Sequence, residues 1–183
     1  MWWIVIGVIG GIGLLLLIIA IYYWNTIIVL GNRIANAKSQ IDVQLKRRAD
    51  LVPSLVETVK GYAKHEKKVF SEVTKARERM MKAGNVEDRV EANNQLTSAL
   101  KTLFAISENY PDLKANENFL QLQEELSSIE NKIAYARQFY NDSVLRFNNM
   151  ITTIPGKFFA GSRKTKNYLE ITVAEKSMPK IEF

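Results

Sequence analysis

The sequence predicts an all-α protein in which one N-terminal transmembrane helix precedes an antiparallel up-and-down four-helix bundle with long helices. Residues 1–32 carry no charged side chain, whereas the rest of the 183-residue chain is densely charged. Beyond residue 25, apolar residues recur every three or four positions, which is the period of an α-helix. This length and pattern predict an anchor at residues 1–25, one helical domain at 26–156 and an irregular tail at 157–183.

The first element is an uninterrupted apolar stretch from Trp2 to Trp24. At a rise of about 1.5 Å per residue it extends about 34 Å, enough to cross a hydrocarbon core of roughly 30 Å. Trp2 and Trp3 at one end, and Tyr22, Tyr23 and Trp24 at the other, match the aromatic belts of membrane interfaces. The stretch lacks the basic start and the small-x-small site of a cleaved signal peptide. We therefore expect a permanent anchor in the lipid bilayer.

Positive charge follows this stretch and does not precede it. Arg33 comes first, and Lys38, Lys46, Arg47 and Arg48 follow. Because the cytoplasmic flanks of membrane helices carry the excess of Lys and Arg, we expect a short N-terminus outside and the C-terminal domain in the cytoplasm. The predicted location is the cell membrane, crossed once, with Arg33 at the inner interface.

Gly7 and Gly11 form a G-x-x-x-G pair inside the apolar stretch. Small residues at this spacing let two membrane helices approach closely, which favours a homo-oligomer. Glycine is also common in membrane helices, so a role in helix association and an incidental pair are both open interpretations.

Four helices are expected at about residues 26–62, 66–83, 86–110 and 117–153. The first and last have the same length and the middle two are shorter, which favours the up-and-down order. Pro53 lies inside the first helix, where it removes one backbone hydrogen bond and is expected to cause a kink. Asn116 is a candidate N-cap of the last helix, and Pro155-Gly156 would end it.

The clearest apolar seam, with the heptad spacing of coiled-coil packing, runs along the last helix. Its members are Phe119, Leu122, Leu126, Ile129, Ile133, Ala136, Tyr140, Ser143, Phe147, Met150 and Ile154. If this helix returns toward the membrane, Phe158 and Phe159 lie near the headgroups, beside several cations. The alternative is that both phenylalanines cover the end of the bundle core.

Arg48 interrupts the apolar seam of the first helix, because it falls between Leu45 and Val52. We expect it to pair with a carboxylate of the last helix, such as Glu124 or Glu125, and so to fix the register of the bundle. The alternative is a slightly rotated helix that lets the guanidinium reach water.

No residue pattern indicates catalysis, a cofactor or a metal. The chain has no cysteine, and His65 is its single histidine, placed in a Lys- and Glu-rich segment typical of a solvated surface. Phosphate-loop, nucleophile-elbow and dinucleotide fingerprints are lacking. The Lys- and Arg-rich stretch from residue 60 to 82 alternates with glutamates, as a solvated helix surface does, so we do not expect nucleic-acid binding.

Two long segments carry a family resemblance. Residues 32–68, NRIANAKSQIDVQLKRRADLVPSLVETVKGYAKHEK, and residues 109–156, NYPDLKANENFLQLQEELSSIENKIAYARQFYNDSVLRFNNMITTIPG, resemble the LemA family of bacterial membrane proteins. Residues 179–183, PKIEF, resemble the usual ending of that family, whereas residues 162–178 match loosely. The resemblance implies a membrane helix with a small external N-terminus and a helical-bundle domain. Some relatives are associated with magnetosome membranes, which implies a role in organising membranes.

The function expected from these features is that of a non-enzymatic, membrane-anchored scaffold that self-associates. The alternative is an adaptor or regulator that recruits another membrane protein, such as an envelope protease or a transporter. A self-assembling scaffold would form large homo-oligomers alone, whereas an adaptor would stay small until its partner is present.

Overall fold

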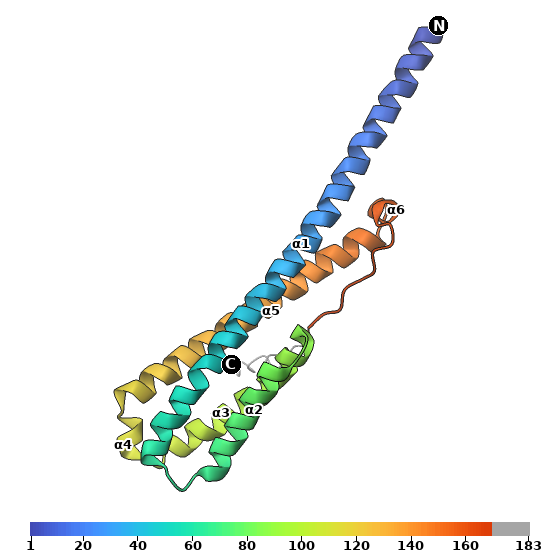
Figure 1. Ribbon diagram of the computed structural model, residues 1–183. Helices are drawn as coiled ribbons and strands as arrows, with labels where there is room; N and C mark the ends of the chain where they lie inside the picture. Colours follow the sequence, from blue (N-terminus) through green and yellow to red (C-terminus); the bar gives the residue numbers. More distant parts are fainter. Residues whose placement is uncertain (170–183) are drawn as a thin grey trace, which may run out of the picture. The chain divides into compact units, whose positions relative to one another are not determined.

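The computed structural model describes residues 1–169, and every regular element in that range is a helix (Figure 1). The helices are α1 (Trp2–Tyr62), α2 (Lys67–Lys82), α3 (Val86–Ser107), α4 (Pro111–Lys114), α5 (Glu117–Thr152) and α6 (Gly156–Phe159). The expectation of an all-α protein with one long apolar N-terminal helix is therefore confirmed. The PKIEF segment, with the rest of residues 170–183, lies outside the described residues.

The anchor and the first bundle helix, which were expected as two elements, form the single helix α1 of 61 residues. The sequence offers no stop between them, because Gly31 is the one glycine and no proline lies between Trp24 and Pro53. Two further helices, α4 and α6, are single turns in segments that were expected to be a turn and an irregular tail.

Pro53 is accommodated inside α1 rather than ending it. Proline has no N–H, so the carbonyl oxygen of Ala49, one turn earlier, has no helical donor. Arg77 of α2 donates a hydrogen bond from Nε to this oxygen, over 2.7 Å. A side chain from a second helix therefore replaces the missing backbone donor.

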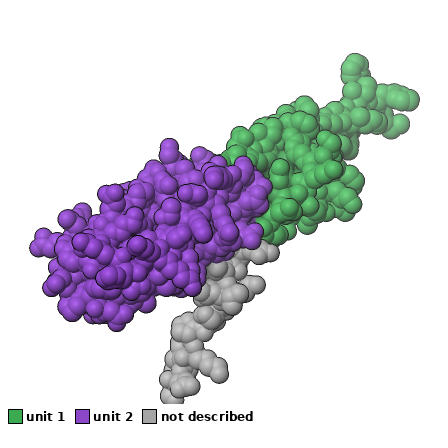
Figure 2. All heavy atoms as spheres, turned by 60° about the horizontal axis from the view of Figure 1, so that its bottom comes forward, with its two compact units in different colours: residues 1–37, 139–168 green, residues 38–138, 169–183 purple. Residues whose placement is uncertain are grey.

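The described residues divide into two compact units (Figure 2). Unit 1 consists of residues 1–37 and 139–168, and unit 2 contains residues 38–138 together with Leu169. Helices α1 and α5 each contribute one part to unit 1 and the other part to unit 2.

Unit 1 has a small apolar core between the two helical parts that it contains. Ile27 and Ile34 of α1 are buried, as are Val144, Phe147 and Ile151 of α5. The buried stripe of α5 differs here from the expected seam, since Ile151 is buried while Met150 is only half-buried; Ile154 lies exposed beyond the end of the helix. A straight α-helix drifts by about 20° per heptad, so a strict seven-residue repeat cannot follow one face over five heptads.

The chain after α6 is held against α5 by hydrogen bonds of Asn148 and Tyr140. Asn148 donates from Nδ2 to the carbonyl oxygen of Lys166 over 2.9 Å, and its Oδ1 accepts from the Lys166 backbone N–H over 2.8 Å. Tyr140 adds a hydrogen bond from its hydroxyl to the carbonyl oxygen of Asn167, at 3.3 Å. These contacts fix the extended segment in unit 1.

The core of unit 2 collects apolar side chains from α1, α2, α3, α4 and α5. The largest fully buried ones are Ile41, Leu45, Leu55, Met80, Leu96, Leu100, Leu103, Leu113, Phe119, Leu126 and Ile129. Helices α2 and α3 lie side by side (Figure 1). The rings of Phe104 and Phe119 meet edge to face, with centroids 6.0 Å apart.

Asparagine side chains begin α3 and α5. Asn85 accepts from the backbone N–H of Asp88 over 2.7 Å, and Asn116 accepts from that of Phe119 over 2.9 Å. Each bond satisfies one of the free N–H groups of a helix start. Asn116 also donates to the Tyr62 hydroxyl over 3.0 Å, which ties the start of α5 to the end of α1.

Candidate functional site

The apolar stretch at the start of α1 exposes its side chains around the whole helix. Its large apolar residues from Ile4 to Ile21 are exposed, except for the half-buried Ile19, and Trp2, Trp3 and Trp24 are exposed as well. Among residues 1–169, α1 is the one helix that is long and apolar enough to cross a membrane. A helix that is apolar all round is stable when it is buried in a protein core or in lipid, and no residue of this apolar window is buried in the protein.

The residues expected at the inner interface contact α6 and the chain that follows it, all within unit 1. The ring of Tyr23 stacks on Phe159, with centroids 5.6 Å apart and planes 16° apart. The guanidinium carbon of Arg163 lies 4.8 Å from the ring centre of Trp24. Tyr22 packs edge to face against Tyr23 at 5.4 Å. Aromatic and basic side chains therefore gather at the end of the apolar stretch.

Arg33 lies further along α1 and packs against α5. Its guanidinium carbon is 4.6 Å from the ring centre of Phe139. Such a cation–π contact holds the long side chain along an aromatic face while leaving its charge accessible.

The net positive charge of the protein is concentrated in unit 1. Unit 1 contains six Lys or Arg residues, which are Arg33, Arg146, Lys157, Arg163, Lys164 and Lys166, and its single acidic residue is Asp142. The whole chain has a formal net charge of +6, so the charges of the remaining residues nearly cancel. The unit that carries the apolar stretch is thus also the basic one.

Gly7 and Gly11 lie on the exposed apolar stretch. A Cβ added at either position would meet nothing within 4 Å among the described residues. This face of the helix is therefore free of contacts with the described residues of the same chain, which leaves room for a helix of a second chain.

Arg48 lies in a polar cluster inside unit 2, where it is 3% exposed. Its Nη1 donates to Asn93 Oδ1 over 2.6 Å and to Thr97 Oγ1 over 2.9 Å, and it forms an ion pair with Glu130. Burial lowers the pKa of the Arg48 guanidinium, and the charge of Glu130 acts in the opposite direction. The cluster joins α1 to α3 and α5.

The carboxylate that pairs with Arg48 is thus Glu130, in place of the expected Glu124 or Glu125. Glu124 is exposed on α5, and Glu125 instead accepts from Arg47 over 2.9 Å. Sequence spacing placed Arg48 at a core position, but the register of α5 against α1 decides which glutamate it meets. Asn93 and Thr97 gave no separate signal, since both fit an ordinary helix surface.

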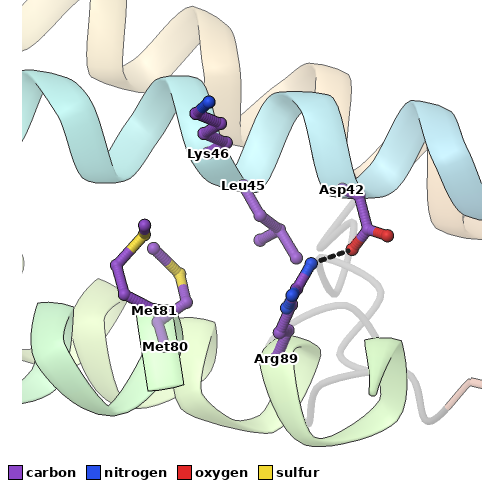
Figure 3. Close-up of a pocket in the computed structure, with 6 residues that line it drawn as sticks. All are labelled: Asp42, Leu45, Lys46, Met80, Met81 and Arg89. Carbon is purple, nitrogen blue, oxygen red and sulfur yellow. Dashed lines mark hydrogen bonds and ion pairs between the residues drawn. The ribbon is translucent and has the colours of Figure 1, made fainter. Parts of the chain in front are cut away.

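A shallow hollow of about 240 Å³ lies between α1, the end of α2 and the start of α3 (Figure 3). Its lining consists of Asp42, Leu45, Lys46, Met80, Met81 and Arg89. This volume lies below the roughly 300–1,000 Å³ of typical small-molecule sites. The hollow is better suited to one protruding side chain than to a cofactor.

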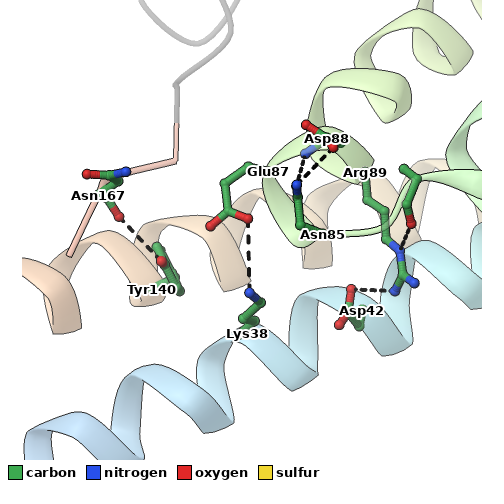
Figure 4. A network of polar contacts seen from close by, with 9 residues as sticks. Lys38, Asp42, Asn85, Glu87, Asp88, Arg89, Tyr140 and Asn167 are labelled. Atoms are coloured by element: carbon green, nitrogen blue, oxygen red, sulfur yellow. Dashed lines mark hydrogen bonds and ion pairs between the residues drawn. The ribbon is translucent and has the colours of Figure 1, made fainter.

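Arg89 of α3 lines this hollow and connects α3 to α1 and to the turn between α2 and α3 (Figure 4). It donates from Nη1 to Asp42 Oδ1 over 2.9 Å and from Nε to the Ala83 carbonyl oxygen over 3.0 Å. Lys38 lies 4.0 Å from Glu87 nearby in unit 2. These contacts hold the α2–α3 turn on α1, and the sequence did not point to them.

No group of three or more His, Asp or Glu side chains within residues 1–169 is placed to hold a metal ion. His65 lies exposed in the turn between α1 and α2.

A model of the LemA family matches residues 37–183 of the chain. The chain belongs to the LemA family. It is 32% identical over 126 residues to Protein LemA of Metamycoplasma hominis, covering 67% of this chain and 56% of that protein. It is 23% identical over 163 residues to Magnetosome protein MamQ 2 of Paramagnetospirillum magneticum and to Magnetosome protein MamQ of Magnetospirillum gryphiswaldense, covering 75% of this chain and 60% of each.

The chain thus spans less than two thirds of the length of these curated relatives. In this LemA-family chain the family match begins after the apolar stretch, at residue 37. It includes the polar cluster of unit 2 and the α6 segment. The exposed apolar part of α1 is therefore an observation about this chain, independent of the family match.

Proposed function

We propose that this LemA-family chain is a single-pass protein of the bacterial cytoplasmic membrane that acts as a non-enzymatic, self-associating scaffold. The observation that carries the proposal is the uncharged stretch from Trp2 to Trp24, which exposes apolar side chains on all sides of α1. In water, an uncovered apolar surface of this length would drive aggregation, whereas a bilayer covers it.

The proposed orientation places the short N-terminus outside and the helical domain in the cytoplasm. The support is the distribution of Lys and Arg, all 25 of which lie on the C-terminal side of the stretch. The helical segments of unit 2 are proposed to act as an up-and-down four-helix bundle. The contacts of Arg48 with α3 and α5, and the packing of α2 on α3, support that arrangement.

The scaffold role has two supports. The MamQ relatives are named as magnetosome proteins, and an organising role in such a structure needs contact surfaces rather than catalysis. The open face around Gly7 and Gly11 gives this chain a place for helix–helix contact inside a membrane.

The second candidate is an adaptor that recruits another membrane protein. The hollow beside Met80 and Met81 favours it, because methionine side chains adapt their shape to a bound partner and Met81 is exposed. Under this alternative, a side chain of the partner would enter the hollow.

The deciding experiment is the mass of the particle extracted from native membranes in mild detergent, measured by light scattering with peptide identification. The scaffold predicts a large particle that contains this chain alone. The variant Gly7→Leu/Gly11→Leu should reduce its mass, whereas Gly13→Leu, on the opposite side of the helix, should not. A small particle that contains a stoichiometric second protein would contradict the scaffold proposal and support the adaptor.

Orientation is tested with single cysteines, since the chain has none of its own. In intact cells an impermeant thiol reagent should label Trp2→Cys and spare Tyr135→Cys, which is exposed on α5. Labelling of Tyr135→Cys in intact cells would reverse the proposed topology.

A further inference from the structure

We propose that residues 154–166, centred on α6, form a second membrane-binding surface that inserts into the interface and binds anionic phospholipid headgroups. The inference rests on the proposed membrane anchoring by α1, and it assigns a lipid class and a binding surface to the membrane contact. Its occupant is the leaflet that surrounds the end of the anchor.

The position of α6 supports the proposal first. Phe159 stacks on Tyr23, and Arg163 lies over Trp24, so α6 is fixed beside the last turn of the apolar stretch. Tyrosine and tryptophan at the end of a membrane helix lie at the headgroup level. A segment in contact with both rings therefore lies at the depth of the interface.

The exposed apolar side chains are the second support. Ile154 and Phe158 are each 75% exposed, although α5 and α1 offer apolar surface in the same unit. Phe159, the next residue after Phe158, is the one that packs on the protein. The α6 turn thus divides its two rings, one toward α1 and one outward, as an interfacial anchor would.

The charges around these side chains are the third support. Lys157, Arg163, Lys164 and Lys166 lie in the segment, and residues 151–169 contain no Asp or Glu. None of the four takes part in an ion pair within the part of the chain that the structure describes. Four cations that have no carboxylate partner among residues 1–169, beside two outward apolar side chains, complement an anionic lipid surface.

A protein partner is less well supported than lipid. The exposed apolar area of the segment consists of two separated side chains, Ile154 and Phe158. Its continuity with the anchor already brings it to the leaflet, whereas a protein would have to compete with lipid for the same position.

The test uses the full chain, reconstituted as single copies in nanodiscs, with a nitroxide label at Phe158→Cys. Collisions with oxygen, which dissolves in lipid, are compared with collisions with a water-soluble nickel chelate. Discs contain phosphatidylcholine alone or a mixture with phosphatidylglycerol. Labels at Ile21→Cys and Tyr135→Cys report the anchor and an exposed site of unit 2.

We expect the Phe158 label to be shielded from nickel in phosphatidylglycerol discs, and less so in phosphatidylcholine discs. Each neutralised cation near the surface should lower the ratio of shielded to exposed label about fivefold. Lys157→Gln and Lys164→Gln should therefore each make the Phe158 label more accessible to nickel. The matched control Lys64→Gln/Lys67→Gln, at exposed positions of unit 2, should leave it unchanged.

The proposal is overturned if the Phe158 label is as accessible to nickel as the Tyr135 label. It is also overturned if the shielding of the Phe158 label is the same in phosphatidylcholine discs and in discs that contain phosphatidylglycerol. Shielding that appears only with two copies per disc would also overturn it and would assign the surface to a second chain. The Ile21 label separates this failure from that of the anchor. If the Ile21 label is in lipid while the Phe158 label is in water, the proposed anchor is supported and the proposed second surface is wrong.

Discussion

Arg77 Nε donates a hydrogen bond to the carbonyl oxygen of Ala49, the acceptor that Pro53 leaves without its helical donor. Ala49 is fully buried, so its carbonyl oxygen cannot turn to bulk water when Arg77 is removed. A proline inside a long helix and an arginine on the neighbouring helix are therefore energetically linked.

This link predicts a coupling between two substitutions. Arg77→Met should lower the free energy of unfolding by about 1–2 kcal/mol, because a buried carbonyl loses its donor. In the Pro53→Ala background the backbone N–H of the new alanine supplies that donor, so the same substitution of Arg77 should cost much less. Denaturant unfolding of the full chain in detergent, followed by helical circular dichroism, measures both costs. Equal costs in the two backgrounds would show that the link is absent.

The Arg48 cluster predicts that Glu130 contributes more to stability than Glu124. Glu130→Gln leaves the buried Arg48 guanidinium without its counter-charge and should cost about 1–2 kcal/mol, a figure reduced from that of a fully buried pair because the Glu130 side chain is 37% exposed. Glu124→Gln, on an exposed position of the same helix, should stay within about 0.5 kcal/mol. The comparison uses denaturant unfolding, and an equal cost for the two variants would assign no stabilising role to the pair.

Gly156 is predicted to be essential for the placement of α6. A Cβ at this position would lie 2.1 Å from the backbone oxygen of Met150, so Gly156→Ala must move the backbone. We expect a loss of about 1–3 kcal/mol, with faster tryptic cleavage after Lys157 and Arg163. Gly84→Ala is the control, since its Cβ would meet nothing within 4 Å. Wild-type cleavage rates in Gly156→Ala would mean that the turn adjusts without displacing α6.

Asn85 is predicted to contribute a helix cap. Asn85→Ala removes the acceptor for the Asp88 N–H and should destabilise the protein by about 1 kcal/mol. Asn85→Ser keeps an acceptor at that position and should retain most of the stability. Thermal or denaturant unfolding distinguishes them, and an alanine variant as stable as the serine variant would contradict the capping role.

The all-helical fold was predictable because the apolar residues keep a period of three to four over most of the chain, and the single apolar stretch is long enough to cross a membrane. The seam of α5 could be followed through Phe119, Leu126, Ile129 and Ile133, which are all buried. It could not be extrapolated to Ile154, because α5 ends at Thr152 and Ile154 lies exposed in the turn that follows.

The candidate site was less predictable, since it depends on contacts between distant segments. Arg48 was recognisable from its place in an apolar seam, but Glu130 depends on the register of two helices. The partnership of Arg77 with Ala49 was hidden, because proline marks a missing donor and does not indicate which side chain replaces it. The packing of Phe159 on Tyr23 required the position of α6, a single turn that has too few residues for a periodic pattern.

The attachment of the segment after α6 has a consequence for how its sequence can vary. Asn148 contacts Lys166 through the backbone N–H and carbonyl oxygen alone, much as a neighbouring β-strand would. That contact does not depend on the identity of the residue at position 166, provided that the residue has an N–H. Substitution can therefore retune the charge that the segment presents while Asn148 keeps the chain in the same place.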